Sequence, residues 1–566
     1  MTTNSKKTDI GYIKITFRVV AILLGLLQAW ANINVLNTDV VSYLDIGDAY
    51  LRGDWKLAIN AVWSPLYSWL LALVMFILKP SPYWEGTCIC FLNFVIYLLT
   101  IICFEFLLNE LIYYHRETSS KLSKKNIIIF PEWAFYSLGY VLFIFCSLEL
   151  IGLFSLSPDM CVSAFVYLIS GIILRIRAGA TGWFIFFLFG FTLSIGYLAK
   201  APMFLLAFVF LIISVFSIGN LKIALPRILV SLICFFLIAG PFIFLLSKSK
   251  GYLTFNENGK LNYAYHVNNL PENWLDGIPA FGLPLNPMEK IFDNPRIRGY
   301  GTIFKEVTYP PLYDPSYWDE GLKLHFDLKE QIRAFLINIK EYGYLFFHLQ
   351  AELVFACLIL FCFSSRKWLC LKDLLESWII IIPALSGMIM YSLVHVENRY
   401  IGAFILLIWM SIFLAIRLPN SKDSMRLLSY TAVVILTMVF IRVSHLTMQN
   451  ISKITQDLAK GKEANTNWLI ANGLNKIGIK AGDKVIALSA NLYWARLAKL
   501  KIVGEVDGDL WNICINSKVQ PQIIAAFASI GTKAIITDDT DSVRKFPFGS
   551  PWQRIGKTNY YVYLLP

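Results

Sequence analysis

The chain has 566 residues, of which 57% are hydrophobic and only 16% are charged. This composition excludes an ordinary soluble domain and predicts a membrane protein. The formal net charge of +12 does not indicate a protein that binds nucleic acid, because the Lys and Arg residues fall mainly in short clusters between apolar runs, as they do in membrane proteins.

The N-terminal two thirds of the chain read as a polytopic α-helical membrane domain. Residues 1–18 are polar and basic and predict a cytoplasmic N-terminus before an uncleaved first span. A spanning helix needs about 20 mainly apolar residues, so the apolar runs within residues 19–443 predict about eleven spans. These spans are expected at 19–36, 87–108, 132–152, 160–174, 182–199, 201–218, 228–246, 345–363, 376–394, 401–416 and 427–443.

This assignment leaves the basic clusters on the cytoplasmic side and two long loops, 37–86 and 247–345, on the outer side. The first loop contains an apolar run at 65–78 that is too short to span, so we expect it to lie at the outer surface. The second loop is rich in aromatic residues and predicts a lid over a site, or else a structural cap. An interfacial helix is expected in it at 328–339.

The tail, residues 444–566, predicts a small extracytoplasmic α/β domain, because short apolar runs alternate there with helical patterns. Strands are expected at 485–488, 502–506, 534–536 and 560–564, and helices at 493–500 and 523–530. The tail carries no glycine fingerprint for a nucleotide.

Ionisable residues beside membrane spans are costly and often functional. In the predicted topology several of them gather on the outer side, namely Asp39, Asp45, Asp48, Asp159, Lys200, His395, Glu397 and Arg399. They fall in or near short motifs, which are Thr38-Asp39-Val40-Val41-Ser42-Tyr43, Ser64-Pro65-Leu66-Tyr67, Ser157-Pro158-Asp159-Met160, Tyr197-Leu198-Ala199-Lys200-Ala201-Pro202 and Glu397-Asn398-Arg399-Tyr400.

In this order the motifs resemble the bacterial relatives of dolichyl-phosphate-mannose protein mannosyltransferases (the glycosyltransferase family 39-like group) and the lipid A aminoarabinose transferases, all fold-C glycosyltransferases. The resemblance covers residues 30–410, the long outer loop and the soluble tail. The chain departs from the family pattern at Val40, where members often carry a second acid, and at Ser64, where they carry a proline. The first departure argues against any role that needs two adjacent carboxylates.

The resemblance implies an inverting transfer of a sugar from a polyprenyl-phosphate donor to an acceptor hydroxyl at the outer membrane–water interface. Asp39 then matches the family's acidic residue and is the expected catalytic base. Lys200 and Arg399 are expected to bind the donor phosphate. The supporting site residues are expected to be Tyr43, Tyr67, Asp159 and Glu397. The alternatives are helix capping for Asp39 and Asp159 and snorkelling for Lys200 and Arg399.

No cofactor is predicted. His395 and Glu397 are two residues apart and do not share a helix face, so the sequence supports neither a bound metal nor a divalent cation. The expected partners are a polyprenyl-phosphate sugar, membrane lipids and an acceptor that is a protein, a lipid or a glycan. A polytopic lipid or sugar transporter is the main alternative, and a non-catalytic scaffold is the second. Transporters often contain two similar halves, and the sequence shows no convincing repeat of this kind. The motifs favour a bacterial inner membrane, with the active site on its extracytoplasmic face.

Overall fold

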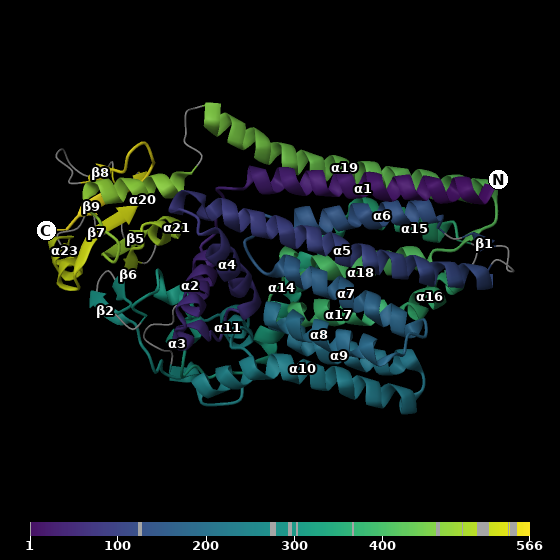
Figure 1. Cartoon of the computed structure of the whole chain (residues 1–566), viewed down its shortest axis with the longest axis horizontal. Coiled ribbons are helices and arrows are strands. Elements are labelled where there is room, and N and C mark those ends of the chain that lie inside the picture. Colours follow the sequence, from purple (N-terminus) through teal and green to yellow (C-terminus); the bar gives the residue numbers. More distant parts are fainter. Residues whose placement is uncertain are drawn as a thin grey trace.

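The computed structural model describes residues 2–565 apart from 123–126, 129, 272–278, 293–296, 302–303, 365–366, 460–464, 490, 507–519, 541–542 and 544–551. The described chain is elongated, with a long bundle of helices at one side and a β-sheet region at the other (Figure 1). We call the end of the bundle next to the sheet the sheet end, and the end that holds the N-terminus the N-terminal end.

The bundle is built mainly from apolar helices. They are α1 (Thr2–Ala31), α5 (Pro82–Leu122), α6 (Glu132–Phe145), the π-helix η2 (Cys146–Ile151), α7 (Asp159–Arg177), α8 (Trp183–Ala199), α9 (Pro202–Ile218), α10 (Leu221–Lys250), α14 (Leu328–Phe347), α15 (Ala351–Cys362), α16 (Lys367–Glu376), α17 (Trp378–Ser392), α18 (Asn398–Ala415) and α19 (Lys422–Ala459). Among the described residues, seven helices are long and apolar enough to cross a membrane, or nine if each of two bent pairs forms one span.

The predicted spans fall on these helices. Two of them coincide with α8 and α9, which have 17 residues each. Two others, 345–363 and 376–394, cover mainly the second helix of each bent pair, in which α14 meets α15 at 73° and α16 meets α17 at 75°. Seven to nine spans are therefore supported by length and composition, and the count of eleven stays a prediction.

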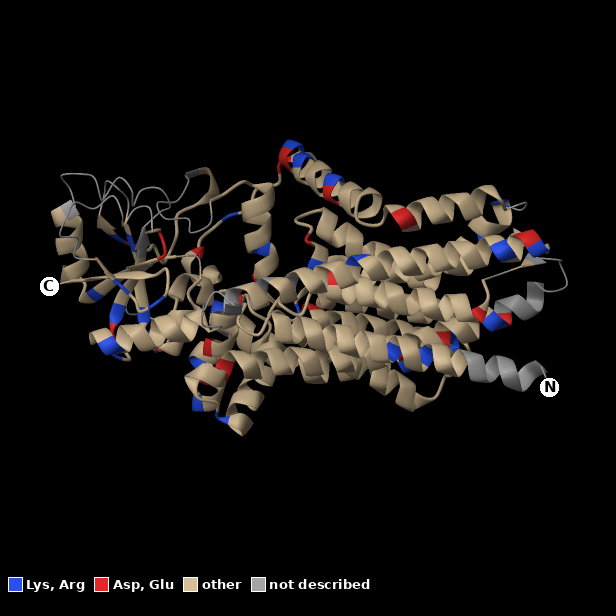
Figure 2. Cartoon of the chain, turned by 90° about the horizontal axis from the view of Figure 1, so that it is seen from above, with Lys and Arg blue, Asp and Glu red and all other residues tan. Residues whose placement is uncertain are grey.

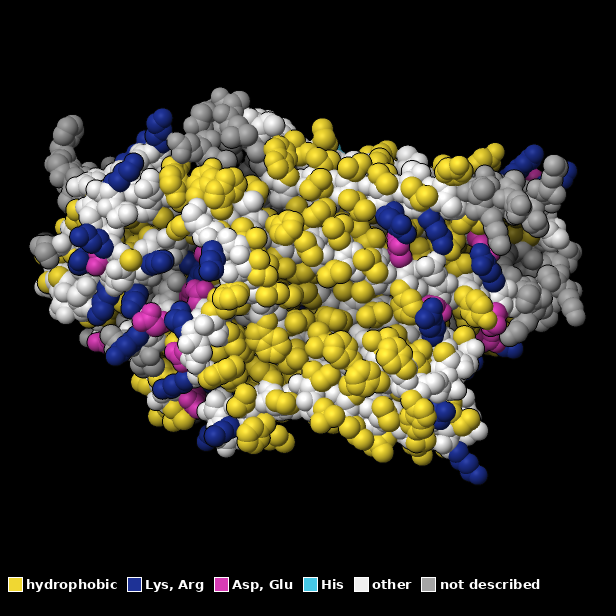
Figure 3. Space-filling model, in the orientation of Figure 1, with side chains coloured by type: hydrophobic (Ala, Val, Ile, Leu, Met, Phe, Trp, Pro, Cys, Tyr) yellow, Lys and Arg dark blue, Asp and Glu magenta, His cyan; other side chains and the backbone are white. Residues whose placement is uncertain are grey.

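The surface of the molecule agrees with a multi-pass membrane protein. Hydrophobic side chains cover the middle of the bundle in the face shown in Figure 3. Charged residues gather towards the two ends and leave the middle of the helices nearly free of charge (Figure 2). Such a belt matches the hydrocarbon core of a bilayer, where an exposed charge is costly.

Short helices cover the sheet end of the bundle. They are α2 (Asp39–Arg52), α3 (Trp55–Ala58), α4 (Pro65–Leu78), α11 (Asn258–Asn262), η3 (Tyr263–Val267), η4 (Pro279–Phe281), α12 (Pro310–Tyr313) and α13 (Pro315–Trp318). The run at 65–78, expected at the surface, forms α4 and packs on α2. Gly47 allows this close approach, since a Cβ there would lie 3.1 Å from the backbone oxygen of Ser68.

The β-sheet is mixed and has seven strands, in the order β2-β3-β6-β5-β7-β9-β8. The strands are β2 (Glu289–Phe292), β3 (Ile297–Gly299), β5 (Lys484–Leu488), β6 (Lys501–Val506), β7 (Thr532–Thr537), β8 (Trp552–Arg554) and β9 (Tyr561–Leu564), and helices α20 (Thr466–Ile477), α21 (Tyr493–Leu497) and α23 (Gln520–Ser529) accompany them. A separate pair, β1 (Ile127–Ile128) and β4 (Leu418–Pro419), lies at the N-terminal end.

All four strands predicted in the tail are present, but β8 is additional, and β2 and β3 come from the outer loop 247–345. β3 pairs antiparallel with β6, so loop and tail share one sheet. The interfacial helix expected at 328–339 is longer and continues to Phe347; its N-cap Asp327 accepts hydrogen bonds from two backbone amides of the first turn. The predicted start of the tail falls within α19, which continues to Ala459.

Candidate active site

A charged cavity of about 440 Å³ lies at the sheet end of the bundle. Its charged lining comes from helices that are far apart in the sequence: Asp39 begins α2, Asp159 begins α7, Lys200 joins α8 to α9, and Arg399 lies in the first turn of α18. Four of the five motifs thus bring their ionisable residues to one place. The catalytic and binding roles of these residues stay predictions.

Asp159 is the buried centre of the charged cavity. Its side chain is only 2% exposed, and its carboxylate accepts hydrogen bonds from Lys200 Nζ at 2.5 Å and Ser157 Oγ at 2.8 Å. The Nε atom of Arg399 lies 3.8 Å from the same carboxylate. A buried carboxylate needs such partners, because an unpaired charge would be strongly destabilised. Asp159 therefore orients both cations.

Arg399 and Lys200 are held from several sides. Arg399 Nε donates to Glu397 Oε2 at 2.6 Å, and its Nη1 lies 3.9 Å from Asp39 Oδ2. The ammonium group of Lys200 sits 3.6 Å from the ring centroid of Tyr400, within cation–π range. Although burial acts to raise the pKa of Glu397, the hydrogen bond from His395 and the charge of Arg399 lower it to about 2. Glu397 therefore stays ionised beside Arg399.

Asp39 faces the charged cavity and keeps contact with solvent, since its side chain is 31% exposed. The N-cap of α2 is Thr38, so the capping role considered for Asp39 does not hold at that position. Burial raises the pKa of Asp39; the charges of Arg399 and Lys200 act against this rise, and those of Glu397 and Asp159 add to it. A carboxylate of raised pKa that is open to solvent can accept a proton.

The two predicted tyrosines have different positions. Tyr43 lines the charged cavity. Tyr67 is fully buried behind it, packs edge-on against Tyr43 at a centroid distance of 5.0 Å, and donates its hydroxyl to Asn93 Oδ1 at 2.8 Å. Tyr67 therefore supports the cavity wall without lining it.

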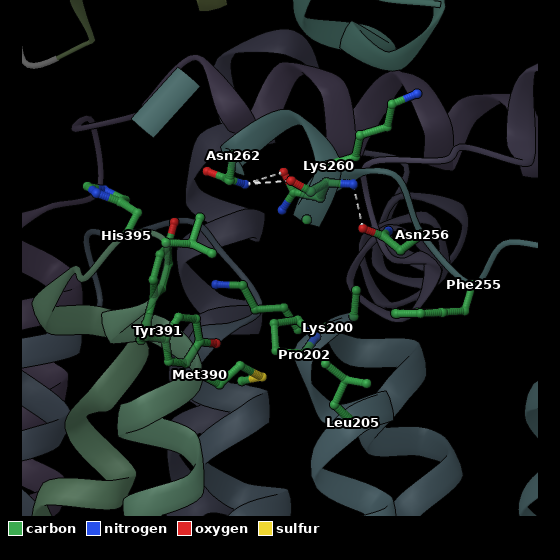
Figure 4. Close-up of a pocket in the computed structure, with 15 residues that line it drawn as sticks. Lys200, Pro202, Leu205, Phe255, Asn256, Lys260, Asn262, Met390, Tyr391 and His395 are labelled. Carbon is green, nitrogen blue, oxygen red and sulfur yellow. Dashed lines mark hydrogen bonds between the residues drawn. The ribbon is translucent and has the colours of Figure 1, made fainter. Parts of the chain in front are cut away.

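A larger pocket of about 970 Å³ adjoins the charged cavity and shares Lys200 and Tyr400 with it (Figure 4). Its floor is apolar and includes Pro202, Leu205 and Met390 from the bundle, whereas Asn256, Lys260 and Asn262 come from the outer loop around α11. The sequence did not single out these loop residues, since they carry no motif and only the aromatic content of the loop indicated a lid.

The loop also contacts the bundle through two histidines. His266 of η3 stacks on His395 with a centroid distance of 3.9 Å, and His395 Nε2 lies 3.4 Å from Glu397 Oε1. Within the described residues, no group of three or more His, Cys, Asp or Glu could hold a metal ion. The expectation that the site uses no metal stays a prediction.

No protein-family model matches the chain, and no curated protein matches it significantly. Among solved structures, ArnT from Cupriavidus metallidurans in the apo state aligns over 98% of this chain and 98% of its own, with 10% identity and a TM-score of 0.51. The same protein bound to undecaprenyl phosphate aligns over the same shares with 11% identity and a TM-score of 0.46. AglB, an archaeal oligosaccharyltransferase from Archaeoglobus fulgidus, aligns over 94% of this chain and 70% of its own, with 12% identity and a TM-score of 0.48.

The TM-scores of the second and third alignments lie below 0.5, so the comparison rests on ArnT in the apo state alone. At 10% identity, that alignment supports similarity of fold and nothing more. The alignment nevertheless runs through nearly the whole chain, including the bundle, the outer loop and the sheet region. The chain therefore has the fold of ArnT.

Proposed function

We propose that the chain is an inverting glycosyltransferase that moves a sugar from a polyprenyl-phosphate donor to an acceptor hydroxyl at the membrane surface. One observation carries the proposal: a solvent-accessible carboxylate, Asp39, and two oriented cations, Lys200 and Arg399, line one cavity at the end of the helical bundle. Glycosyl transfer from a lipid phosphate needs a base for the attacking hydroxyl and positive charge for the departing phosphate.

The reaction is a single displacement. The acceptor oxygen forms a bond to the anomeric carbon while the bond from that carbon to the phosphate oxygen breaks, which inverts the anomeric configuration. Asp39 takes the proton of the acceptor hydroxyl, and the bonding electron pair leaves with the polyprenyl phosphate. Lys200 and Arg399 stabilise the charge that develops on the departing phosphate.

The adjoining pocket has the chemistry to receive the lipid end of the donor. Its apolar floor of Pro202, Leu205 and Met390 continues from Lys200, so a phosphate at Lys200 would extend its prenyl chain along an apolar surface. ArnT, whose fold the chain has, was also solved bound to undecaprenyl phosphate. The apolar floor beside Lys200 therefore supports a lipid-phosphate donor, and it does not identify the sugar.

We further propose that the sheet end faces the outside of a bacterial inner membrane and that eleven segments cross it. The two 17-residue helices α8 and α9 run in the bundle beside longer spans (Figure 1) and would cross with them. The basic loops after α7 and α9 then lie on the cytoplasmic side, in agreement with the positive-inside rule. The acceptor would be a hydroxyl of a protein, lipid or glycan that reaches the cavity from outside.

The test is release of polyprenyl phosphate by purified protein in bilayers, with a panel of labelled polyprenyl-phosphate sugars and a crude envelope extract as acceptor. Asp39→Asn is expected to abolish release, because the amide cannot act as a base. The matched control is Asp54→Asn in the same loop, where the side chain caps α3 by accepting from the amide of Leu57 and Asn can cap equally well.

Release by wild type and Asp54→Asn but not by a folded Asp39→Asn supports the proposal. Release by all three keeps the enzyme and removes Asp39 from the reaction. If no donor is turned over while the lipid moves across the bilayer, the chain is a transporter and the proposal is wrong.

A further inference from the structure

The tail inserts one guanidinium group among carboxylates of the membrane region. Arg496 of α21 is only 9% exposed, and its Nη1 lies 2.7 Å from Asp45 Oδ1 and 2.9 Å from Asp48 Oδ2. Its Nε lies 3.1 Å from Glu85 Oε1, to which the hydroxyl of Tyr493 also donates. Asp45 and Asp48 belong to α2, and Glu85 lies in the first turn of α5. One tail residue thus joins two helices of the membrane region.

Asp45 also binds the outer loop. Its carboxylate accepts from the backbone amide of Thr308 at 2.7 Å and from the hydroxyl of Thr308 at 3.2 Å. The side chain is 4% exposed, and burial raises its pKa to about 6 although Arg496 and Thr308 act to lower it. Three segments, α2, the outer loop and the tail, therefore meet at a single buried carboxylate whose partners are costly to remove.

The ion pairs of Arg496 hold α2, the helix that begins with Asp39. Asp45 and Asp48 lie six and nine positions after Asp39, about 9 and 13.5 Å along the helix axis. At about 100° per residue, Asp45 lies about 120° and Asp48 about 180° round the helix from Asp39. One side of α2 therefore contacts Arg399 through Asp39, and the other contacts Arg496.

We infer that Arg496 is a positioning residue for the transfer reaction: by clamping Asp45 and Asp48, the tail fixes α2 so that Asp39 points into the charged cavity. This inference rests on the proposed function, and it gives the tail a catalytic support role instead of acceptor binding. A shift of about 1 Å in a catalytic group lowers rates by up to about a hundredfold, so even a loosened clamp affects turnover.

The test compares Arg496→Gln with Arg554→Gln. Arg554 also lies in the tail, in β8, and donates to the backbone oxygen of Thr558, away from α2. For each folded protein, kcat and the KM values for donor and acceptor are measured, together with hydrogen exchange of the α2 amides. Asp48→Asn, which removes one of the three carboxylates and leaves the other two contacts of Arg496, serves as a milder second variant.

If Arg496 holds α2 in place through Asp45 and Asp48, Arg496→Gln should lower kcat by about tenfold or more and leave both KM values nearly unchanged. The backbone amides of α2 should also exchange their hydrogens faster. Asp48→Asn should show smaller changes in the same directions, and Arg554→Gln should match wild type. A wild-type kcat in both clamp variants overturns the inference, as does a raised acceptor KM with unchanged kcat, which would make the tail an acceptor-binding domain.

The two proposals fail separately. If the wild-type protein transfers no sugar, the proposed function is wrong, but hydrogen exchange still reports on the clamp. Unchanged α2 exchange in Arg496→Gln would then reject the clamp by itself.

Discussion

At the scale of single residues, the two aspartates of the charged cavity differ in burial. Asp159 is almost wholly buried and is bonded to Lys200 and Ser157, whereas Asp39 is partly exposed and only loosely approached by Arg399. A carboxylate already saturated by cations is a poor base, and one open to a hydroxyl is a better one. The geometry therefore assigns orientation to Asp159 and supports proton transfer by Asp39.

With Asp39 as the proposed base, its raised pKa predicts the pH profile of the proposed transfer reaction. The reaction needs the ionised carboxylate, so activity falls as the pH drops through the pKa of the folded protein. Burial places this pKa above the ordinary value of 3.8, and the acidic limb of kcat/KM should lie above it as well. Because the charge of Arg399 acts to lower the pKa of Asp39, the acidic limb of kcat/KM should lie at higher pH in Arg399→Gln than in wild type. A limb at or below pH 3.8, or one unmoved in Arg399→Gln, would contradict the assignment.

Lys200 is expected to bind phosphate and to stabilise Asp159, and two variants separate these effects. Lys200→Met keeps the apolar stem but leaves Asp159 with fewer partners, which should cost up to about 3 kcal/mol of stability. Adding Asp159→Asn removes the buried charge and should restore much of this loss. Polyprenyl-phosphate affinity should stay at least about tenfold weaker in both. If the double variant binds the lipid phosphate like wild type, Lys200 is only structural.

Tyr67 provides a test of which tyrosine belongs to the site. Tyr67→Phe removes a buried hydrogen bond to Asn93 and should lower the free energy of unfolding by about 1 kcal/mol, with turnover of the folded protein unchanged. Tyr43→Phe alters the cavity wall itself and should lower turnover. Thermal unfolding and kcat measured on both variants check this, and a loss of turnover in Tyr67→Phe would place its hydroxyl in the reaction.

At the scale of elements, the packing of α8 on α10 depends on a glycine. A Cβ on Gly190 would lie 2.2 Å from the backbone oxygen of Ser231, so the two helices touch through their backbones there. Gly190→Ala should push them apart and cost about 1–3 kcal/mol. Gly240→Ala on α10, where a Cβ meets nothing within 4 Å, is the matched control and should be neutral or slightly stabilising. Equal melting temperatures for the two variants in detergent would contradict this packing.

The sequence predicted the positions of helices and strands better than the contacts between segments that are far apart in the chain. The motif around Asp39 placed an acid at the start of α2, and apolar runs located most of the bundle helices, because both signals are local. Helix α16 was not predicted, and α14 was expected as an interfacial helix of the outer loop. Asp45 and Asp48 were recognised as outer acids, but their partner Arg496 is more than 400 residues away and lies in no motif. The bends between α14 and α15 and between α16 and α17 were also missed, since α14 was assigned to the outer loop and no helix was predicted in place of α16.

At the scale of the whole molecule, loop and tail form one unit through the sheet. The sequence separated them because alternating patterns identify a strand but not its neighbour, and β3 and β6 pair although about 200 residues separate them in the sequence. The charged cavity is lined by α2, by the bundle and by Asn258 of the outer loop. The tail contacts α2 through Arg496, which pairs with Asp45 and Asp48.

Asp39 is proposed to perform the chemistry while Lys200 and Arg399 bind the donor, and one comparison separates these two roles. Binding of the donor and its single-turnover transfer are measured on the same purified wild-type and Asp39→Asn proteins in bilayers, with the donor that wild type uses. Asp39→Asn is expected to bind the donor within a fewfold of wild type but to transfer no sugar. Transfer at the wild-type rate by Asp39→Asn, or loss of donor binding with unchanged transfer of what is bound, would contradict it.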